Sequence, residues 1–575
     1  MNRGILPRER VMPGMILTNA VIHTSDDQCP VADTVVIRGG RFEWVGCASD
    51  LPADHDLPTV DLEGRTVIPG LIDAHSHPAL VAMSRWHVQL PETHSADELL
   101  DAIRDHGAAH PKEEAPYLYF EYFPTALLGE AGATKELLDS AISDRPVLVQ
   151  DSGDHASWVN TRMLELLGVD ENTPDPVPGL ERFARDAGGR PTGYIFENAH
   201  ARFLPRMYES LGWTPPERPT PEIIRPVLDF LGSTGVVAVF DALIESPEVI
   251  TAMRELDSRG DLHMHYEGAI RFRTLADLPE ALETVAALDD DSGSSKVRVR
   301  TVKLFLDGTN ELGSGAVIDP LLSEDNAGPL GAIQMELDDL VECLRLCNGA
   351  AVDLHIHMVG DRAFRTACDA VERARSQVEA EGIAWNVQVT FAHCELVDPA
   401  DLARPAELGV IVNWTNHWSG GYFGEEAARH LGTHRWERMY DVAAIADAGA
   451  RVTFSSDVVS AAELHRAAPF FGMQIAVTRI DPEVPLDAER FVESRRPAAA
   501  ASLSLSRLLR GYTIDASVQL RIEKDYGSVS PGKLANLVVL NVDPFTTPGY
   551  DLAAVHPTAV VYRGAVVSGY LPAPR

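Results

Sequence analysis

The sequence predicts an α/β fold: a (β/α)8 or TIM barrel, with a small β-sandwich domain formed by both termini and a large insertion after the first barrel strand. Three observations support this prediction. Strand-like apolar runs alternate with helical patterns through the middle of the chain, as in parallel α/β folds. There are eight such runs, which is the number that closes a parallel barrel. Short strand-like segments separated by Gly and Pro occupy both ends of the 575-residue chain.

The eight predicted barrel strands are apolar runs, most of which end in polar or charged residues. They cover residues 66–75, 235–241, 262–270, 297–307, 351–357, 387–393, 409–414 and 451–457. Helical periodicity at 337–346 and at 362–379 supplies the crossovers between the fourth, fifth and sixth strands. Because the polar residues lie at the C-terminal ends of the strands, we expect them on the rim where barrel active sites lie.

The two ends of the chain are expected to pair into one β domain beside the barrel. The strand-like segments that support this are 15–22, 34–37, 42–45, 536–541 and 559–562. The predicted division of the chain is 1–66 for the N-terminal part of the β domain, 67–505 for the barrel and 506–575 for the C-terminal part of the β domain.

The connection between the first and second predicted strands is far longer than the helix and two loops of a usual barrel crossover. Residues from about 79 to 230 are therefore expected to form an inserted lobe. Within it, Ser95 and Glu98 make a capping-box pattern ahead of an apolar helix, and 117–123 and 146–150 are strand-like. An insertion at this point projects from the C-terminal face of the barrel, beside the expected active site.

The composition excludes polyanionic partners. The chain has 49 Lys+Arg and 85 Asp+Glu, so its formal net charge is 49 − 85 = −36, which would repel nucleic acids and anionic membranes. The sequence contains no run of about 18 apolar residues, so it predicts no transmembrane helix. The start of the chain lacks the apolar stretch of a secretory signal. The six cysteines are scattered without a CxxC pair, which favours a cytoplasmic protein.

Histidines and an aspartate occur at the ends of four predicted barrel strands. His75 and His77 follow one another on the first strand, and side chains two apart on a strand share a face, so both can bind one metal ion. His357 ends the fifth strand, His393 the sixth and Asp457 the eighth. Each residue alone is compatible with a satisfied polar side chain at a strand exit. Their convergence on one rim predicts a metal site.

Lys303 lies in an otherwise apolar strand, VKLFL (302–306), in a chain that has only six lysines. A buried charged lysine is costly unless it is paired or neutral. Two interpretations stay open. Lys303 forms an ion pair with a carboxylate such as Asp307 or Glu267, or it carries a CO2-derived carbamate that offers an anionic oxygen ligand to two metals.

Five motifs resemble those of the amidohydrolase superfamily, in the branch that includes N-substituted formamide deformylases. They are VIPGLIDAHSHP (67–78), VKLFLDGT (302–309), HMVGDRA (357–363), FAHCE (391–395) and SSD (455–457). The resemblance covers essentially the whole chain after the first dozen residues. It implies a (β/α)8 barrel with a β domain built from both termini, and one or two divalent metal ions at the strand ends. Zinc is favoured, with manganese and iron as alternatives.

The resemblance also implies a role for each of the strand-end residues. His75 and His77 would bind the more buried metal. A carboxylated Lys303 would bridge to a second metal, which His357 and His393 would hold. Asp457 would be a ligand of the first metal and the general acid/base.

The predicted activity is hydrolysis of a C–N bond of the amide type in a small molecule by metal-activated hydroxide. A divalent metal lowers the pKa of a bound water to about 7, and Asp457 beside it would move the proton to the leaving amine. One alternative uses the same metal site for deamination, decarboxylation, isomerisation, or oxygen chemistry with iron or manganese. A second alternative, a non-catalytic metal-binding or regulatory protein, is disfavoured because every predicted ligand is present.

Substrate recognition is expected from the inserted lobe and the remaining strand ends. The residues predicted to contact the substrate are His155, Trp158, Glu267, Trp414 and His417, because aromatic side chains at a barrel mouth can stack on apolar groups. Core packing is the alternative for both tryptophans. The expected partners are a small-molecule substrate and a second copy of the chain in a homodimer, without nucleic acid or membrane.

Overall fold

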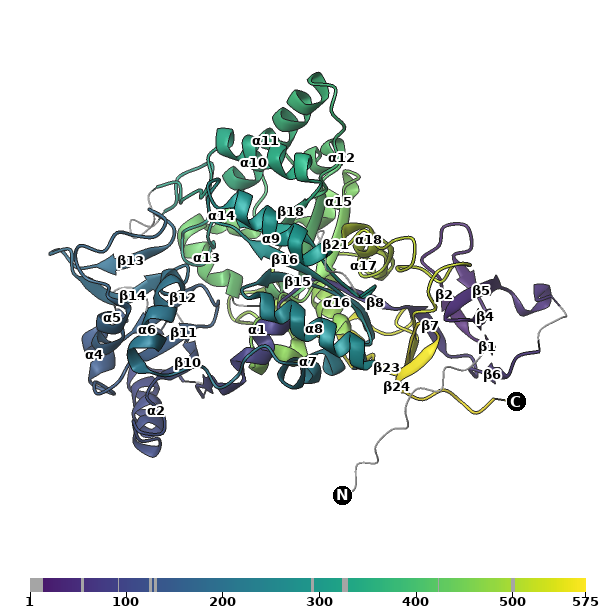
Figure 1. The fold of residues 1–575 in the computed structure, drawn as a ribbon, viewed down its shortest axis with the longest axis horizontal. Helices are drawn as coiled ribbons and strands as arrows, with labels where there is room; N and C mark the ends of the chain where they lie inside the picture. The colour runs from purple at the N-terminus through teal and green to yellow at the C-terminus, as the bar shows by residue number, and fades with distance from the viewer. Residues whose placement is uncertain are drawn as a thin grey trace.

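The computed structural model describes residues 14–52, 56–91, 93–123, 127–128, 132–290, 294–322, 329–421, 423–497 and 502–574. Its centre is a sheet of eight parallel strands that are neighbours in chain order (Figure 1). The strands are β8 (Leu71–Ser76), β15 (Val236–Ile244), β16 (His265–Arg271), β17 (Val297–Phe305), β18 (Asp353–Met358), β19 (Val389–His393), β20 (Ile411–Thr415) and β21 (Arg451–Ser455). The Asp457 N–H donates to the His75 carbonyl at 2.9 Å, so the last strand meets the first. The sheet is nearly closed into a barrel, which confirms the predicted fold class.

The first predicted strand, 66–75, is divided between two sheets. Thr66–Pro69 forms β7 in a terminal sheet, and Leu71–Ser76 forms β8 in the barrel. At Gly70, between them, a Cβ atom would lie 2.4 Å from a methyl carbon of Val237. Only glycine fits this close approach of the chain to the neighbouring barrel strand, so the chain passes from one sheet to the other at Gly70.

Helices pack around the barrel strands (Figure 1). They are α1 (Pro78–Met83), α7 (Pro221–Ser233), α8 (Pro247–Arg259), α9 (Leu278–Asp290), α10 (Leu337–Ala350), α11 (Asp361–Ala380), α12 (Arg404–Leu408), α13 (Phe423–Leu431), α14 (Thr433–Glu437), α15 (Val442–Asp447), α16 (Pro469–Thr478), α17 (Leu505–Gly511) and α18 (Ile514–Gln519). Val302 and Leu304 of β17 belong to the large core between strands and helices. Because neighbours on a strand point to opposite faces, Lys303 between them points into the barrel.

Both ends of the chain contribute strands to two sheets beside the barrel, in the orders β5-β4-β1-β6 and β24-β23-β22-β7-β2-β3. The strands other than β7 are β1 (Gly14–Thr18), β2 (Val21–His23), β3 (Val31–Ala32), β4 (Thr34–Arg38), β5 (Arg41–Gly46), β6 (Thr59–Asp61), β22 (Leu537–Leu540), β23 (Pro557–Tyr562) and β24 (Ala565–Gly569). Strand β22 pairs antiparallel with β7. Leu17 and Val67 from the N-terminal part share one apolar core with Leu537 and Val561 from the C-terminal part. The sandwich therefore needs both ends of the chain.

A third sheet, in the order β13-β14-β12-β11-β10-β9, lies between β8 and β15 in the chain. Its strands are β9 (Val88–Gln89), β10 (Leu118–Phe123), β11 (Val147–Asp151), β12 (Ala156–Val159), β13 (Arg182–Arg185) and β14 (Pro191–Phe196), with α2 (Ala96–Ala109), α4 (Lys135–Asp139), α5 (Thr161–Leu167) and α6 (Leu204–Leu211) beside them. Ser95 caps α2 by accepting the Glu98 N–H at 3.2 Å. Figure 1 shows this lobe and the terminal sheets on opposite sides of the barrel.

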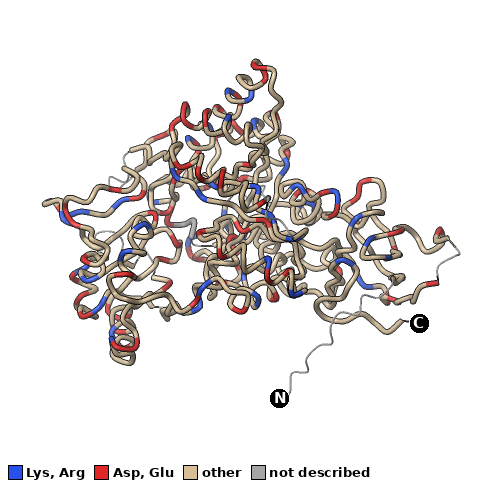
Figure 2. Tube along the Cα trace, in the orientation of Figure 1, with Lys and Arg blue, Asp and Glu red and all other residues tan. Residues whose placement is uncertain are grey.

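Acidic residues occur along the whole described trace, in the barrel, the lobe and the terminal sheets (Figure 2). Lys and Arg are interspersed among them. The acidic residues are therefore spread along the whole described chain, and their distribution marks no single segment as a partner site. None of the described helices combines the length and the apolar character needed to cross a membrane.

Candidate metal centre and its cavity

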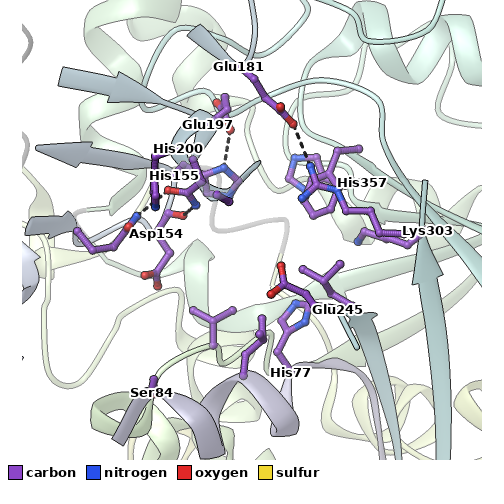
Figure 3. A pocket seen from close by; sticks show the side chains of 18 of the residues that line it. His77, Ser84, Asp154, His155, Glu181, Glu197, His200, Glu245, Lys303 and His357 are labelled. Carbon is purple, nitrogen blue, oxygen red and sulfur yellow. Dashed lines mark hydrogen bonds and ion pairs between the residues drawn. The ribbon is translucent and has the colours of Figure 1, made fainter. Parts of the chain in front are cut away.

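A cavity of about 1090 Å³ lies where the C-terminal ends of the barrel strands meet the lobe. Figure 3 shows His77, Lys303 and His357 on the barrel side of this space, with His155 and Glu197 facing them from the lobe. The six predicted metal ligands all line the cavity: His75, His77, Lys303, His357, His393 and Asp457. They come from five different barrel strands or the residues directly after them.

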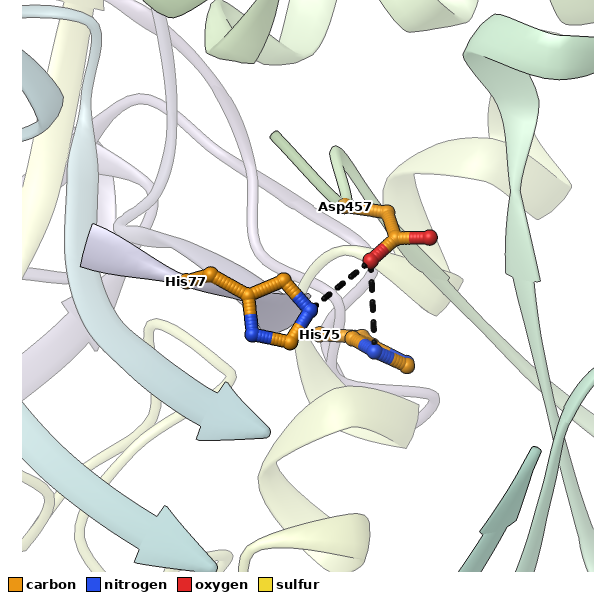
Figure 4. A group of neighbouring side chains, drawn as sticks. All are labelled: His75, His77 and Asp457. Atoms are coloured by element: carbon orange, nitrogen blue, oxygen red, sulfur yellow. Dashed lines mark hydrogen bonds and ion pairs between the residues drawn. The ribbon is translucent and has the colours of Figure 1, made fainter. Parts of the chain in front are cut away.

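Three of these residues form a compact group of donor atoms (Figure 4). The Oδ1 atom of Asp457 lies 3.1 Å from His77 Nε2 and 3.3 Å from His75 Nε2. Two donor atoms that are each about 2.1 Å from a tetrahedral ion are about 3.4 Å apart. The distances to Asp457 therefore fit a shared divalent cation, and imidazole nitrogen with carboxylate oxygen is a donor set that such cations accept.

A second group of donors adjoins the first. The ring centroids of His357 and His393 are 4.5 Å apart, and His393 Nδ1 lies 3.6 Å from Asp457 Oδ2. His357 Nε2 lies 3.1 Å from the Gly308 carbonyl oxygen and must donate to it, which leaves the lone pair of a neutral ring on Nδ1. One oxygen of Asp457 thus faces the His75 and His77 group, and the other faces His393.

Burial keeps the imidazoles of His75, His357 and His393 neutral. It lowers the pKa of His75, His357 and His393 well below the usual 6.5, and neighbouring positive charge, including that of Lys303, lowers it further. His355, on β18, lies behind this layer with its Nε2 atom 3.1 Å from His75 Nδ1. This contact orients the His75 ring so that Nε2 faces Asp457. Neutral, oriented imidazoles are the form that binds a metal.

Lys303 is completely buried at the centre of this wall. Burial lowers its pKa to about 7. Asp307 accepts three backbone N–H groups, those of Ala316, Val359 and Gly360, and Glu267 lies 3.2 Å from His265 Nε2. Among the described residues, neither carboxylate forms an ion pair with Lys303. The structure therefore does not support an ion pair of Lys303 with Asp307 or Glu267.

The backbone is in the left-handed region at three non-glycine residues of the site. The φ angles are 72° at His393, 47° at Cys394 and 54° at Asp457. Such conformations cost of order 1–3 kcal/mol each and persist where the surrounding structure imposes them. They occur where two predicted ligands leave their strands, which is typical of a functional site.

His155 is the predicted substrate contact that the structure brings into the cavity. Its Nδ1 atom lies 2.6 Å from Glu197 Oε2, and its ring centroid is 5.8 Å from that of His357. Glu197 Oε1 accepts the Thr309 N–H at 3.2 Å. Burial alone would lower the pKa of His155, but the charge of Glu197 and its hydrogen bond outweigh burial and raise it above 6.5.

The two predicted aromatic contacts lie away from the cavity lining. Trp158 is fully buried in the core of the lobe, where its Nε1–H donates to the Thr134 carbonyl at 2.8 Å. Trp414 is 1% exposed and belongs to the core between the barrel strands and the helices, with its ring near those of Tyr440 and Phe454. Both side chains point away from the cavity and pack in the cores on the other face of their strands.

Glu267 and His417 also lie outside the lining. Glu267 is near the start of β16, below the rim, and contacts His265. His417 is buried, its Nε2 atom is 2.5 Å from the Arg466 carbonyl oxygen, and its ring stacks on Phe471. These two side chains have structural partners of their own.

Several lining residues were absent from the sequence prediction. They are Glu121, Glu181, Glu197, Arg202, Arg271 and Arg273. Glu121 interrupts the apolar strand β10 just as Lys303 interrupts β17, so the same signal could have identified it. Its Oε2 atom accepts the Ser460 hydroxyl at 2.6 Å, three residues after Asp457. Arg271 directly follows the third predicted barrel strand, 262–270, so its place at a strand end could have identified it too. No sequence pattern marks the other four.

Comparisons with known proteins agree with this geometry. The family model described as "Amidohydrolase family" matches residues 58–568. The exoenzymes regulatory protein AepA of Pectobacterium carotovorum is 28% identical over 76% of this chain and 92% of its own. The N-substituted formamide deformylase of Arthrobacter pascens is 25% identical over 93% and 94%. The crystal structure of an uncharacterised metal-dependent hydrolase of Pyrococcus horikoshii has the same fold, with a TM-score of 0.65 at 22% identity over 93% of this chain and 99% of that one.

Proposed function

Because the chain belongs to the amidohydrolase family of metal-dependent hydrolases, we propose that it hydrolyses a C–N bond of the amide type in a small molecule. The relative from Arthrobacter pascens, named as a deformylase of N-substituted formamides, supports an amide as the class of substrate. The cavity of about 1090 Å³ is slightly larger than the usual range for small-molecule sites, about 300–1,000 Å³.

The observation that carries the proposal is the position of the Asp457 carboxylate between two groups of buried imidazoles. His75 and His77 would hold one divalent ion together with Asp457, and His357 and His393 would hold a second, with carboxylated Lys303 shared between them. Zinc is the favoured metal, with manganese or iron as alternatives. When bound, a divalent cation lowers the pKa of a water ligand to about 7 and polarises a carbonyl oxygen.

Asp457 is placed to act as the general acid/base. Its side chain is 12% exposed, so it reaches the cavity while its oxygens contact the imidazoles. It would accept a proton from the attacking water and return it to the leaving nitrogen. The lobe supplies the opposite wall of the cavity, from which His155 faces the same space.

A second candidate function is regulation without catalysis, which takes support from the name of the Pectobacterium relative. Its weakness is the complete donor set, since a protein that has lost its reaction no longer needs Asp457 in a strained backbone conformation between buried histidines. The same site could also serve deamination, decarboxylation, isomerisation or oxygen chemistry, and the products formed distinguish these reactions from hydrolysis.

The test uses full-length protein that is stripped of metal and then loaded with zinc, manganese or iron. N-formyl and N-acetyl amines, with ureas and aminopyrimidines for comparison, are assayed for release of the acid and the amine. We expect hydrolysis of amides by the loaded protein, and a fall in kcat of about a thousandfold in Asp457→Asn. Asp447→Asn, a change at an exposed aspartate paired with Arg507, is the matched control. Full activity in Asp457→Asn or His75→Ala, or no amide cleavage with any metal, would overturn the proposal.

A further inference from the structure

Three arginines share one buried glutamate in the wall of the cavity. Arg271 ends β16, Arg273 follows it, and Arg202 lies in the 3-10 helix η3 (Ala199–Phe203) of the lobe. Glu181 Oε2 is 3.0 Å from Arg202 Nε, and Glu181 Oε1 is 3.1 Å from Arg271 Nη2 and 3.8 Å from Arg273 Nε. We call Arg202, Arg271 and Arg273 the arginine cluster.

The arginine cluster carries more positive charge than Glu181 neutralises. Within the described part of the chain, the only ion pairs of these three guanidinium groups are those with Glu181. Glu217 and Glu245 also line the cavity but make no ion pair with the cluster. The Nε atoms of Arg271 and Arg273 are buried without a hydrogen-bond partner among the described residues. These two atoms are out of reach of solvent, but the Nη atoms of Arg202 and Arg273 belong to partly exposed side chains and donate no hydrogen bond within the described part of the chain. The cluster therefore has hydrogen-bonding capacity for a further acceptor in the cavity.

The mutual repulsion within the cluster is visible in Arg271. Burial and the charges of Arg273 and Arg202 together lower its pKa to about 10, against the opposing charges of Glu181 and Glu245. One arginine would suffice to pair with Glu181. Three at one carboxylate, in a protein with a net charge of −36, therefore need another explanation.

The cluster lies next to the proposed reaction centre. Arg271 pairs with Lys303 in the register of β16 and β17, and its guanidinium lies 4.5 Å from the ring centroid of Phe305. The side chains of Arg202 and Arg273 are 33% and 30% exposed, so both reach the open part of the cavity. Arg271 could balance a carboxylated Lys303, but this would leave Arg202 and Arg273 with Glu181 as the one carboxylate they pair with among the described residues.

We infer that the arginine cluster binds an anionic group of the substrate, so that the amide cleaved at this site carries a carboxylate or a phosphate-like group. Arginine suits this role because its planar fork of donors matches the geometry of both anions. Glu181 holds the three side chains together and shares them with the anion when substrate is bound. The statement that the bound molecule is a cleaved amide rests on the proposed function. The statement that the cluster binds an anion does not.

The test measures binding without turnover, on metal-free full-length protein at low ionic strength. The probes are N-formylphenylalanine of either hand, its carboxamide and its phosphonate analogue, because Trp86, Tyr119 and Tyr208 also line the cavity and accept an aromatic group. We expect the carboxylate or the phosphonate to bind at least about tenfold more tightly than the carboxamide. The tighter of the two identifies the anion.

The Arg273→Gln variant should lose this preference, and Arg273→Lys, which keeps the charge, should retain part of it. Arg259→Gln is the matched control, because Arg259 is an exposed arginine of α8 paired with Glu222 and Glu255. Melting temperatures show whether each variant is folded. Equal binding of all probes, no binding of any, or a preference that survives in Arg273→Gln would overturn the inference. Because no turnover is measured, failure of the hydrolysis proposal would leave this result intact.

Discussion

Asp73 accepts two hydrogen bonds from Ser456, one from its backbone N–H at 3.0 Å and one from its hydroxyl at 2.6 Å. Asp73 precedes His75 by two residues on the first barrel strand, and Ser456 precedes Asp457 after the last. The buried carboxylate therefore fixes the distance between the two chain segments that carry the first group of metal donors. Asp73 is a positioning residue, since it acts through Ser456 and contacts no reacting atom.

We expect Ser456→Ala to lower kcat/KM by about tenfold, because one hydrogen bond of about 1.5 kcal/mol to a buried carboxylate is lost at the residue that positions Asp457. Ser455→Ala is the matched control. Its hydroxyl donates to Asn413 Oδ1 at 3.0 Å, so a similar bond is lost beside the site but not to Asp73. Steady-state kinetics on both variants, with melting temperatures, make the comparison. An equal effect of the two changes would contradict the positioning role.

Lys303 should take up CO2 with a midpoint near neutral pH. Carbamate formation joins the amine lone pair to the carbon of CO2 and releases a proton, so it needs the neutral amine. Burial lowers the pKa of Lys303 to about 7, so at pH 8 about 90% of this amine is neutral, against under 1% of an ordinary lysine. Uptake should therefore rise as the pH increases from 6 to 8.

The carbamate can be followed by NMR of protein incubated with ¹³C-labelled bicarbonate. Lys303→Met should abolish the signal. Lys296→Gln should retain it, because Lys296 is the other lysine near the barrel but pairs with Asp257 at 3.0 Å. A signal that is absent from the wild type with metal present, or that persists in Lys303→Met, would contradict the two-metal version of the site. The single-metal version at His75, His77 and Asp457 would be unaffected.

The parts of the molecule that follow from strand periodicity could be predicted from the sequence. Barrel strands end in a common plane, so the positions of His75, His357, His393 and Asp457 in the sequence were enough to bring them to one rim. The family resemblance drawn from five short motifs is confirmed by the family match over residues 58–568. The boundary at Gly70 could not be predicted, because it depends on the contact with Val237.

Side chains whose role depends on which face of a strand they occupy were harder to predict. Trp158 and Trp414 have the residue type of a substrate contact, but packing against their own cores places them on the opposite face. Glu181 and Glu197 reach the cavity because the lobe folds over the barrel. No local pattern encodes that approach, since it depends on contacts between residues more than 100 positions apart, such as Glu197 with Ser314.

Loss of the Glu197 charge should affect both catalysis and stability. Glu197 holds His155 at 2.6 Å and accepts hydrogen bonds from Thr309 and Ser314 of the barrel. Hydrogen bonds to a charged group contribute about 1.5–3 kcal/mol, so Glu197→Gln should lower kcat/KM by roughly 10- to 100-fold and lower the melting temperature. Glu165→Gln, at an exposed lobe residue paired with Arg162, is the control. If both variants behave like wild type, Glu197 does not couple the lobe to the site.

Metal removal should destabilise the protein through the same residues that are proposed to bind the ion. A ligand that binds only the folded state stabilises it by about 2.7 kcal/mol at a free concentration 100 times its Kd. Adding zinc to metal-free protein should therefore raise the melting temperature by several degrees, and a chelator should reverse the shift. His77→Ala removes a donor that lies 3.1 Å from Asp457 and should lose most of this shift. His434→Ala, at an exposed histidine of α14, should keep it. A shift that survives in His77→Ala would place the stabilising ion elsewhere on the molecule, because a buried site with one of its three closest donors missing cannot hold the ion with unchanged affinity.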